Sequence, residues 1–346
     1  MRYFYIALLI FSSTSFFSDL FASSLNIEAS LSYGDEKDEP DLQILGAIDI
    51  DVFDPVLSAF SRKNPKISIT YSMASTADIY DAVRQENHKY DLIMSSAMDL
   101  QMKLVNDGFA KPIDILEEVD VPAWSHWQDK LFGFSLEPIG LVLSASHFKK
   151  EDIPITRRNL VSYLKANSEN MQKKIVTYDV RTSGAGFLFA TQDERKSNSF
   201  WRLAEVMGGL NAHLSCCSGI MLDAVNDEEF LLAYNIIGSY AEKRSRFQKN
   251  LKVVYFQDYT HLLLRTAFIP KTVTDETKII EFLGFILNET GQNFIEKETD
   301  MISLRSSILK ENPHFKPIRL DTGLLVYLDR LKRERFLEEW SSALIQ

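Results

Sequence analysis

A glycine-rich turn between a predicted strand and a predicted helix could bind an anion. The segment DVRTSGAGFLFATQDE covers residues 179–194 and follows the apolar stretch KKIVTY. Gly184 and Gly186 permit a tight turn and close approach of a ligand, and Thr182 and Ser183 add hydroxyl groups. A helix that begins here directs free backbone N–H groups and the positive end of its dipole toward the turn. An ordinary capped helix is the alternative interpretation of the same residues.

No catalytic or cofactor motif accompanies this turn. Phe189 stands where a dinucleotide-binding fingerprint has its third glycine, and the Gly-Lys-Ser/Thr sequence of a P-loop is missing. Arg181 replaces the first glycine that a nucleophile elbow around Ser183 would need. The six histidines show no metal-binding spacing. We therefore expect a protein that is not an enzyme and that carries neither a cofactor nor a metal.

Polar residues also follow three successive predicted strands. The strands LQILGAI, ISITY and YDLIMS alternate with helical patterns, which indicates a parallel sheet with helices on both faces. Ligands of such sheets bind at the carboxyl ends of the strands. Taken singly, these residues are more often turn or capping residues, but as a group they predict one edge of a binding site. They are Asp49, Ser72, Ser75, Thr76, Ser95 and Ser96.

Two long extended segments predict two lobes joined by a hinge. LFGFSLEPIGLVLS contains Pro138, which is unfavourable in a central strand, so we interpret it as a connection between lobes. A second extended stretch covers about 252–268. We expect a two-lobed α/β fold that closes on a small ligand. Lobe 1 would comprise 42–134 and 258–346, and lobe 2 would comprise 135–257.

The N-terminus has the composition of a secretory signal peptide. Arg2 precedes the apolar run YFYIALLIF, which is too short to span a bilayer, and small residues follow. We expect cleavage near Ser24 and a periplasmic protein; an uncleaved anchor is the alternative. The acidic stretch that follows predicts a mobile lead-in over 25–41.

The overall charge and the cysteines restrict the remaining possibilities. The net charge is -10, and the sequence has no long basic run. We interpret the short basic run Lys332–Arg335 as a solvated helix face. We therefore expect no nucleic-acid partner. The two cysteines, Cys216 and Cys217, are adjacent. Either a vicinal disulfide or two buried free thiols would suit an exported protein.

Five segments together resemble a known family. They are YDLIMSSAMDLQMKLVNDGFA, FGFSLEPIGLVLS, TSGAGFLFATQD, CCSGIMLDAVNDEEFLLAYNIIGSYA and GLLVYLDRLKRERFLEEW. Over roughly residues 42–340 the chain resembles periplasmic solute-binding proteins of ABC transporters, in particular the sugar-phosphate and phosphoglycerate-related branch of the ferric-iron-binding superfamily. The resemblance implies a type II periplasmic-binding-protein fold with two crossover strands. It also implies a monomer that serves an ABC permease or a membrane sensor kinase.

The chain departs from the iron-binding members of that family. Those proteins present two adjacent tyrosines after an asparagine, whereas Ile236, Ile237 and Gly238 follow Asn235 here. Tyr234 and Tyr240 are too far apart in sequence to replace the pair. The resemblance therefore implies a small phosphorylated organic anion as ligand, with ferric iron and a pure interaction protein as alternatives.

The resemblance also turns the opening motif into a specific hypothesis. The turn from Thr182 to Gly186 would hold a phosphate, and the helix start at Ser218 would add further N–H donors. Asp223, Asn235 and Asp258 would receive hydroxyl groups of a sugar or glycerate. Glu137 could be a hinge residue or a ligand contact, and Arg181 could neutralise phosphate or remain an exposed strand-end charge.

Overall fold

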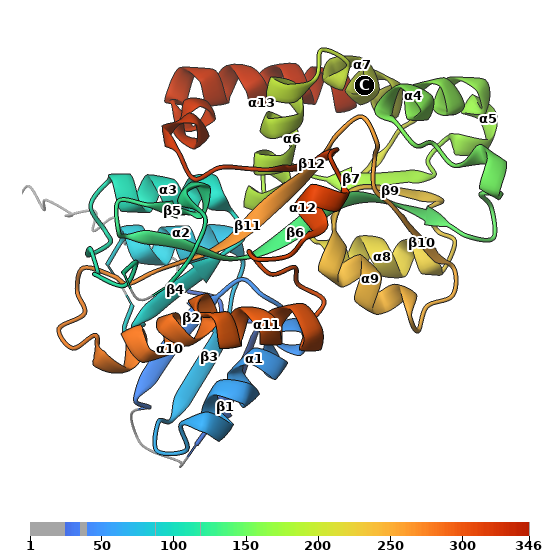
Figure 1. Cartoon of the computed structure of the whole chain (residues 1–346). Helices are drawn as coiled ribbons and strands as arrows, with labels where there is room; N and C mark the ends of the chain where they lie inside the picture. Colours follow the sequence, from blue (N-terminus) through green and yellow to red (C-terminus); the bar gives the residue numbers. More distant parts are fainter. Residues whose placement is uncertain (1–24, 35–39, 87, 118, 346) are drawn as a thin grey trace, which may run out of the picture.

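The structure, a computed structural model, describes residues 25–34, 40–86, 88–117 and 119–345, and it confirms the predicted two-lobed α/β fold (Figure 1). The predicted signal peptide, residues 1–24, lies outside the described residues. Within the described part of the chain, no helix is long and apolar enough to cross a membrane.

Lobe 1 is built on the three strand–helix repeats that the sequence predicts. Its strands pair in parallel in the order β3-β2-β4, and α1 buries Phe53, Leu57 and Phe60 against them. The elements from the first part of the chain are β1 (Ala29–Tyr33), β2 (Leu42–Gly46), α1 (Ile50–Lys63), β3 (Ile69–Met73), α2 (Thr76–Arg84), β4 (Leu92–Ser95), α3 (Met98–Asn106), η1 (Ala123–Ser125) and β5 (His126–Trp127). The later elements are α10 (Thr277–Leu287), α11 (Glu289–Glu298), α12 (Ile308–Glu311) and β12 (Phe315–Pro317).

The prediction of a mobile lead-in over 25–41 is wrong for β1. This strand pairs antiparallel with β3, from Ala29 opposite Met73 to Tyr33 opposite Ile69. Leu31 and Tyr33 pack against the buried cluster of lobe 1. Alternating apolar side chains thus tie this segment to the sheet edge, although the acidic residues around it favour solvent. Residues 35–39 lie outside the described residues.

Lobe 2 repeats the parallel arrangement with β9, β7 and β8. Strand β10 joins it antiparallel to the second half of β6 (Leu131–Ser144). The elements of the lobe are η2 (Lys150–Asp152), α4 (Arg157–Ala166), α5 (Ser168–Met171), β7 (Ile175–Tyr178), α6 (Gly184–Lys196), α7 (Phe200–Gly209), β8 (His213–Ser215), α8 (Ser218–Asn226), β9 (Leu232–Ile237), α9 (Gly238–Ser245) and β10 (Leu251–Val254).

Two antiparallel strands, β6 (Leu131–Ser144) and β11 (Thr260–Phe268), connect the lobes. Every residue of both strands is buried, which explains their long apolar runs. Pro138 lies where β6 changes partner: residues up to Pro138 pair with β11, and those from Ile139 pair with β9. A residue without an N–H group is tolerated at this junction.

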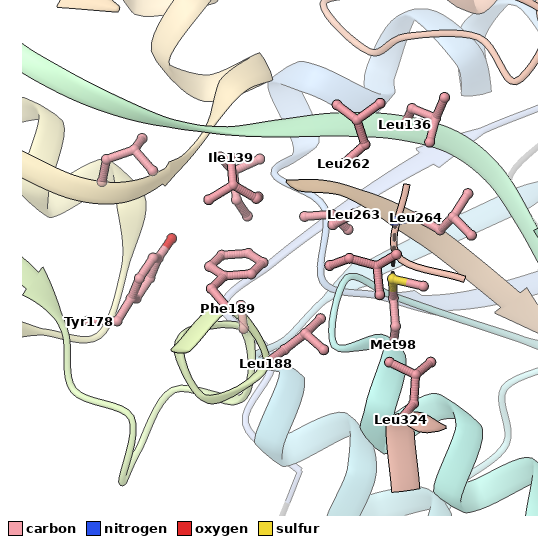
Figure 2. Packing of buried hydrophobic residues seen from close by; sticks show 14 of the residues in the cluster. Met98, Leu136, Ile139, Tyr178, Leu188, Phe189, Leu262, Leu263, Leu264 and Leu324 are labelled. Carbon is pink, nitrogen blue, oxygen red and sulfur yellow. Dashed lines mark hydrogen bonds between the residues drawn. The ribbon is translucent and has the colours of Figure 1, made fainter. Parts of the chain in front are cut away.

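One apolar cluster continues through the hinge. Figure 2 shows Leu188 and Phe189 of α6 packed toward Leu263 of β11, with Met98 of α3 nearby. The Leu264 N–H lies 3.2 Å from the Met98 sulfur. Because α6 is anchored on the hinge by these side chains, its N-terminus has a fixed direction toward lobe 1.

The sequence-based prediction placed all of 258–346 in lobe 1, but the C-terminal helix packs on lobe 2 instead. After η3 (Thr322–Leu328), helix α13 (Arg330–Leu344) lies along lobe 2 beside α7 (Figure 1). Phe336 and Trp340 are buried in the same cluster as Leu160 and Phe200 of lobe 2. The chain therefore crosses between the lobes a third time, which the polar helical pattern of α13 did not reveal.

This packing predicts that α13 stabilises lobe 2. Trp340 is 3 % exposed, so Trp340→Ala should lower the free energy of unfolding by about 3–5 kcal/mol. Leu331 of the same helix is 65 % exposed, and Leu331→Ala should change it by less than about 0.5 kcal/mol. Urea unfolding followed by circular dichroism measures both; equal losses would contradict the assignment of α13 to lobe 2.

Candidate ligand-binding cleft between the lobes

Two helix N-termini, one from each lobe, approach each other across the cleft. Ser75 caps α2, and its hydroxyl accepts the N–H of Asp78 at 3.1 Å. Ser183 caps α6 and accepts the N–H of Gly186 at 3.2 Å. The two starts meet at Gly184, where a Cβ atom would lie only 2.8 Å from the Thr76 hydroxyl. The predicted residues Ser75, Thr76, Ser183 and Gly184 are therefore brought together across the cleft.

Two pockets have walls from both lobes, and the first is named the tyrosine pocket. It has a volume of about 320 Å³. Lobe 1 contributes the N-terminus of α1 and the end of β3, and lobe 2 contributes α9. Its lining residues are Asp49, Ile50, Asp51, Val52, Met73, Tyr240, Lys243 and Arg244.

Charged groups of both lobes meet in the tyrosine pocket. Burial raises the pKa of Asp49, and the positive charge of Arg265 partly opposes this. Burial also raises the pKa of Tyr240 to about 12, with Arg265 acting in the opposite direction. At neutral pH the Tyr240 hydroxyl is therefore a neutral hydrogen-bonding group beside an acidic residue.

A buried ion pair lies behind the tyrosine pocket in the hinge. Arg265 of β11 donates from Nε to Glu137 of β6, and both side chains are 0 % exposed. The second carboxylate oxygen of Glu137 accepts the N–H of Ser239 at 3.2 Å. The Arg265 guanidinium carbon lies 5.4 Å from the centre of the Tyr240 ring, so the pair is adjacent to the pocket.

Three buried donors at this point lack partners. Neither terminal nitrogen of Arg265 has a hydrogen-bond acceptor of good geometry within the described residues, and the same holds for the Ser239 hydroxyl. An unsatisfied buried donor costs roughly 1–3 kcal/mol, and more for a charged group. Buried polar groups are nearly always satisfied, so such a concentration of free donors marks a place that a ligand or water completes.

The second pocket, called here the helix pocket, contains the predicted phosphate-binding turn. It measures about 350 Å³. Its cations are Lys103, Arg181 and Arg333, of which Lys103 is paired with Asp107 and Arg181 with Asp179. Asp99 is 2 % exposed, and burial raises its pKa to about 7. The lining residues are Ala77, Tyr80, Asp81, Asp99, Leu100, Lys103, Val180, Arg181, Thr182, Ser183, Gly184, Phe187, Leu328 and Arg333.

Several predicted residues serve the fold instead of lining a pocket. Gly186 packs against Tyr178, where a Cβ atom would lie 2.4 Å from the Tyr178 Cβ. The Ser95 hydroxyl accepts the N–H of Ala97 at 3.2 Å, and Ser96 is buried behind the same strand end. Ser218 is buried and hydrogen-bonded to the Tyr178 hydroxyl. Close packing and capping explain these positions.

Three predicted hydroxyl-binding residues have other partners. Asp223 is exposed and forms an ion pair with Arg244. The Asn235 amide donates to Asp193 at 3.0 Å, and Asp258 pairs with Arg157 at 3.3 Å. None of the three lines either pocket, so we do not include them in the candidate site.

Asp193, Asn235 and Asp258 belong to a separate buried network around Arg157. The Arg157 guanidinium is bonded to the Asp193 carboxylate at 3.0 Å, to the Tyr234 hydroxyl at 3.0 Å and to the Tyr259 carbonyl at 2.7 Å. Each nitrogen of the Arg157 guanidinium has a hydrogen-bond acceptor in this network, in contrast to Arg265.

Sequence reasoning missed Arg265 and did not assign Tyr240 to the site. Arg265 stands alone within HLLLRTAFI, and a single charge in a buried strand is expensive unless it is paired or used. This single charge in an apolar run could have marked Arg265 as a candidate site residue. The sequence around Tyr240 gives no such signal, because only the fold places Tyr240 beside Asp49.

The two cysteines are joined by a disulfide. Cys217 is the N-cap residue of α8, so the disulfide precedes this helix at the surface of lobe 2. Of the two alternatives left open by the sequence, the structure has the vicinal disulfide.

Comparison with known proteins places this arrangement among binding proteins. A structure of the substrate binding protein of an ABC transporter from Agrobacterium tumefaciens is 28 % identical, covers 91 % of this chain and 98 % of its own, and superposes with a TM-score of 0.86.

Iron-binding proteins share the fold at lower identity. Apo ferric ion-binding protein A from Pasteurella haemolytica is 16 % identical with a TM-score of 0.62, and iron-bound HitA from Pseudomonas aeruginosa is 16 % identical with a TM-score of 0.64. Each covers 88 % of this chain and 96 % of its own. No protein-family profile and no curated protein matches. The similarity to these solved structures shows that the chain has the type II periplasmic-binding-protein fold.

The contact at Gly184 predicts a variant that opens the lobes. In Gly184→Ala the new methyl group would collide with the Thr76 hydroxyl and approach Leu100, so the closed form should lose about 1–3 kcal/mol. Small-angle X-ray scattering should show a larger radius of gyration. Adding Thr76→Ala should partly reverse the change, and Thr76→Ala alone should leave the radius unchanged. An unaltered radius in Gly184→Ala would refute the steric role.

The Arg157 network predicts a pH-dependent contribution to stability. Burial would raise the pKa of Asp193, but the charge of Arg157 dominates and holds this pKa well below its ordinary value. The stabilisation is therefore present above the unfolded-state pKa of about 3.9 and is lost as pH falls toward the depressed value. Asp193→Asn should cost about 3–5 kcal/mol at pH 7, and the difference from wild type should shrink below about pH 4.

Urea unfolding at pH 7, 5 and 3.5 measures this dependence. Asp114→Asn, at an exposed position, is the matched control and should follow the wild type. A cost of Asp193→Asn that is constant over this range would contradict the assignment.

Proposed function

We propose that this protein is a periplasmic solute-binding protein of an ABC transporter that holds a small phosphorylated organic anion between its lobes. The similarity over nearly the whole length of a substrate-binding protein supports the general role. The permease would receive the closed, loaded form; a membrane sensor kinase is the alternative recipient. The N-terminal signal sequence supports export to the periplasm.

The observation that carries the ligand class is the set of unpaired donors at the hinge. The two terminal nitrogens of Arg265 and the Ser239 hydroxyl are buried beside the tyrosine pocket. A phosphoryl or carboxylate group offers several acceptor oxygens, and a guanidinium binds them with charge-assisted hydrogen bonds. An anionic group placed there would satisfy all three donors at once.

The glycine-rich turn would supply a second contact to the same class of solute. Thr182, Ser183 and Gly184 line the helix pocket at the N-terminus of α6, opposite Lys103 of lobe 1. The helix dipole and the cations favour negative charge at contact distance, although the protein is acidic overall. Because both pockets have walls from each lobe, a bound solute would favour closure.

Ferric iron is the second candidate, and Asp49 with Tyr240 is the observation that favours it. A carboxylate and a phenol share the tyrosine pocket, and such hard oxygen ligands suit Fe(III). Within the described residues, no cluster of three or more His, Cys, Asp or Glu side chains could hold a metal. Iron would therefore depend on tyrosine ligands, and the nearby Arg265 charge opposes a cation.

Thermal unfolding with a panel of solutes tests the proposal. The panel contains phosphate esters, phosphonates, inorganic phosphate, free sugars and Fe(III). A solute at 100 times its Kd stabilises by about 2.7 kcal/mol, which should raise Tm by roughly 2–4 °C. A shift with organic phosphates supports the proposal. A shift with Fe(III) alone, together with a visible phenolate-to-iron absorption band, would replace it with the iron function.

A charge-neutral double variant tests the role of Arg265. Replacing Arg265 alone would leave Glu137 buried without its partner, so Arg265→Gln is combined with Glu137→Gln. Loss of the buried donor pair should weaken binding of the organic phosphate by about 100-fold or more. Isothermal titration calorimetry measures this change.

The control is Arg330→Gln, an exposed position paired with Glu334, which should bind like the wild type. Circular dichroism and unperturbed cooperative unfolding establish that the double variant is folded. Binding by the folded double variant within about threefold of wild type would show that Arg265 does not anchor the solute.

A further inference from the structure

The tyrosine pocket contains one acidic residue that has no ion-pair partner in the described part of the chain. Among the described residues, the Asp49 carboxylate has no basic partner at ion-pair distance, and it forms no capping bond at the start of α1. It lies in the wall of the pocket that lobe 1 provides. A partly buried carboxylate of this kind normally acquires a positive partner.

The cations around Asp49 are already engaged by other carboxylates. Lys243 is 2.9 Å from Asp51, and Arg244 pairs with Asp223. Arg265 pairs with Glu137. The charges of these three pairs cancel, so Asp49 leaves the pocket with one surplus negative charge.

Further acidic groups extend this surplus along lobe 1. Burial raises the pKa of Glu28, and the negative charges of Asp49 and Asp78 raise it further, so the three carboxyl groups of lobe 1 are close enough to interact. The unpaired donors, in contrast, lie on the hinge and on lobe 2, at Arg265 and Ser239. The cleft therefore has an acidic wall on one side and a donor-rich wall on the other.

We propose that the solute is a zwitterion, with an ammonium group bound by Asp49 and an oxyanion group bound by Arg265 and Ser239. The inference rests on the proposed function and specifies the class of solute bound at that site. An aminoalkyl phosphonate, an aminoalkyl phosphate or an amino acid has the required pair of charges. Asp49 is then the residue that determines specificity for the amine.

Charge balance distinguishes this solute from a simple anion. A simple anion would satisfy the Arg265 donors but would add negative charge beside Asp49, and like charges repel in a partly desolvated site. A zwitterion supplies a counter-charge to each wall, and its ammonium group offsets one negative charge that the matching simple anion would add beside Asp49. A simple cation would leave the three donors unsatisfied.

Two matched pairs of probes test the proposal. 2-Aminoethylphosphonate is compared with ethylphosphonate, and β-alanine with propionate, because the members of each pair differ in the ammonium group. For wild-type protein we expect the amine to lower Kd at least tenfold in one pair or both, measured by isothermal titration calorimetry. Tighter binding of the phosphonate pair supports both proposals, whereas amine-dependent binding of the carboxylate pair alone would keep the zwitterion and overturn the phosphorylated ligand.

Asp49→Asn should abolish this preference while keeping the Arg265 anchor. Both members of the bound pair should then have Kd values within about threefold of each other, and the amine-free member should bind no more weakly than to wild type. Asp51→Asn is the control, since Asp51 is paired with Lys243 and its side chain is 66 % exposed. It should retain at least a fivefold preference for the amine.

Failure of this inference is distinguishable from failure of the proposed function. Equal binding of amine and amine-free probes by wild type, or an undiminished preference in folded Asp49→Asn, would overturn the zwitterion while the anion receptor stands. If the phosphate esters of the thermal panel bind but none of the four probes does, the zwitterion is likewise overturned. If no oxyanion of any kind binds, both proposals fall.

Discussion

The ion pair between Arg265 and Glu137 is the constraint on which the cleft depends. It lies in the two strands that connect the lobes, and both side chains are fully buried. Removing two charges from water is costly, and replacing such a pair with apolar residues is often stabilising. A pair of this kind within an otherwise apolar hinge is thus better explained by binding than by stability. Its position fixes one guanidinium at the junction that both lobes share.

Comparison of the two buried arginines supports this interpretation. Arg157 is bonded through its ε nitrogen and both terminal nitrogens, to Tyr234, Asp193, Asp258 and the Tyr259 carbonyl. Arg265 is equally buried, but within the described residues its hydrogen bond of good geometry is the one from Nε to Glu137. A completed network gives rigidity, whereas an incomplete one retains donors for a partner that is not part of the chain. Burial is the same in both cases, so satisfaction of the donors separates a structural group from a binding group.

Under the proposed function, closure and binding are coupled, because neither lobe contains the whole candidate site. Asp49 comes from lobe 1, Tyr240 from lobe 2 and Arg265 from the hinge. The Gly184 contact with Thr76 limits how far the lobes can approach. A solute that bridges the walls stabilises the closed form by its differential affinity, which is the physical basis for recognition of the loaded state. The apolar cluster of α6 and β11 in Figure 2 anchors α6 on the hinge.

The sequence by itself determined the elements and the order of the fold, but it determined only part of the site. Alternating strand and helix patterns predicted the parallel strands of lobe 1, and the apolar run around Pro138 predicted the first crossing, because local periodicity reports burial directly. The capping pattern likewise placed Ser75 and Ser183 at helix starts that meet across the cleft. The position of α13 on lobe 2 could not be predicted, since an amphipathic helix does not encode which apolar surface it covers. Nor could the sequence decide that Asn235 and Asp258 have internal partners while Arg265 does not. Whether a polar side chain is satisfied depends on residues that are distant in the chain, and only the tertiary structure brings those residues together.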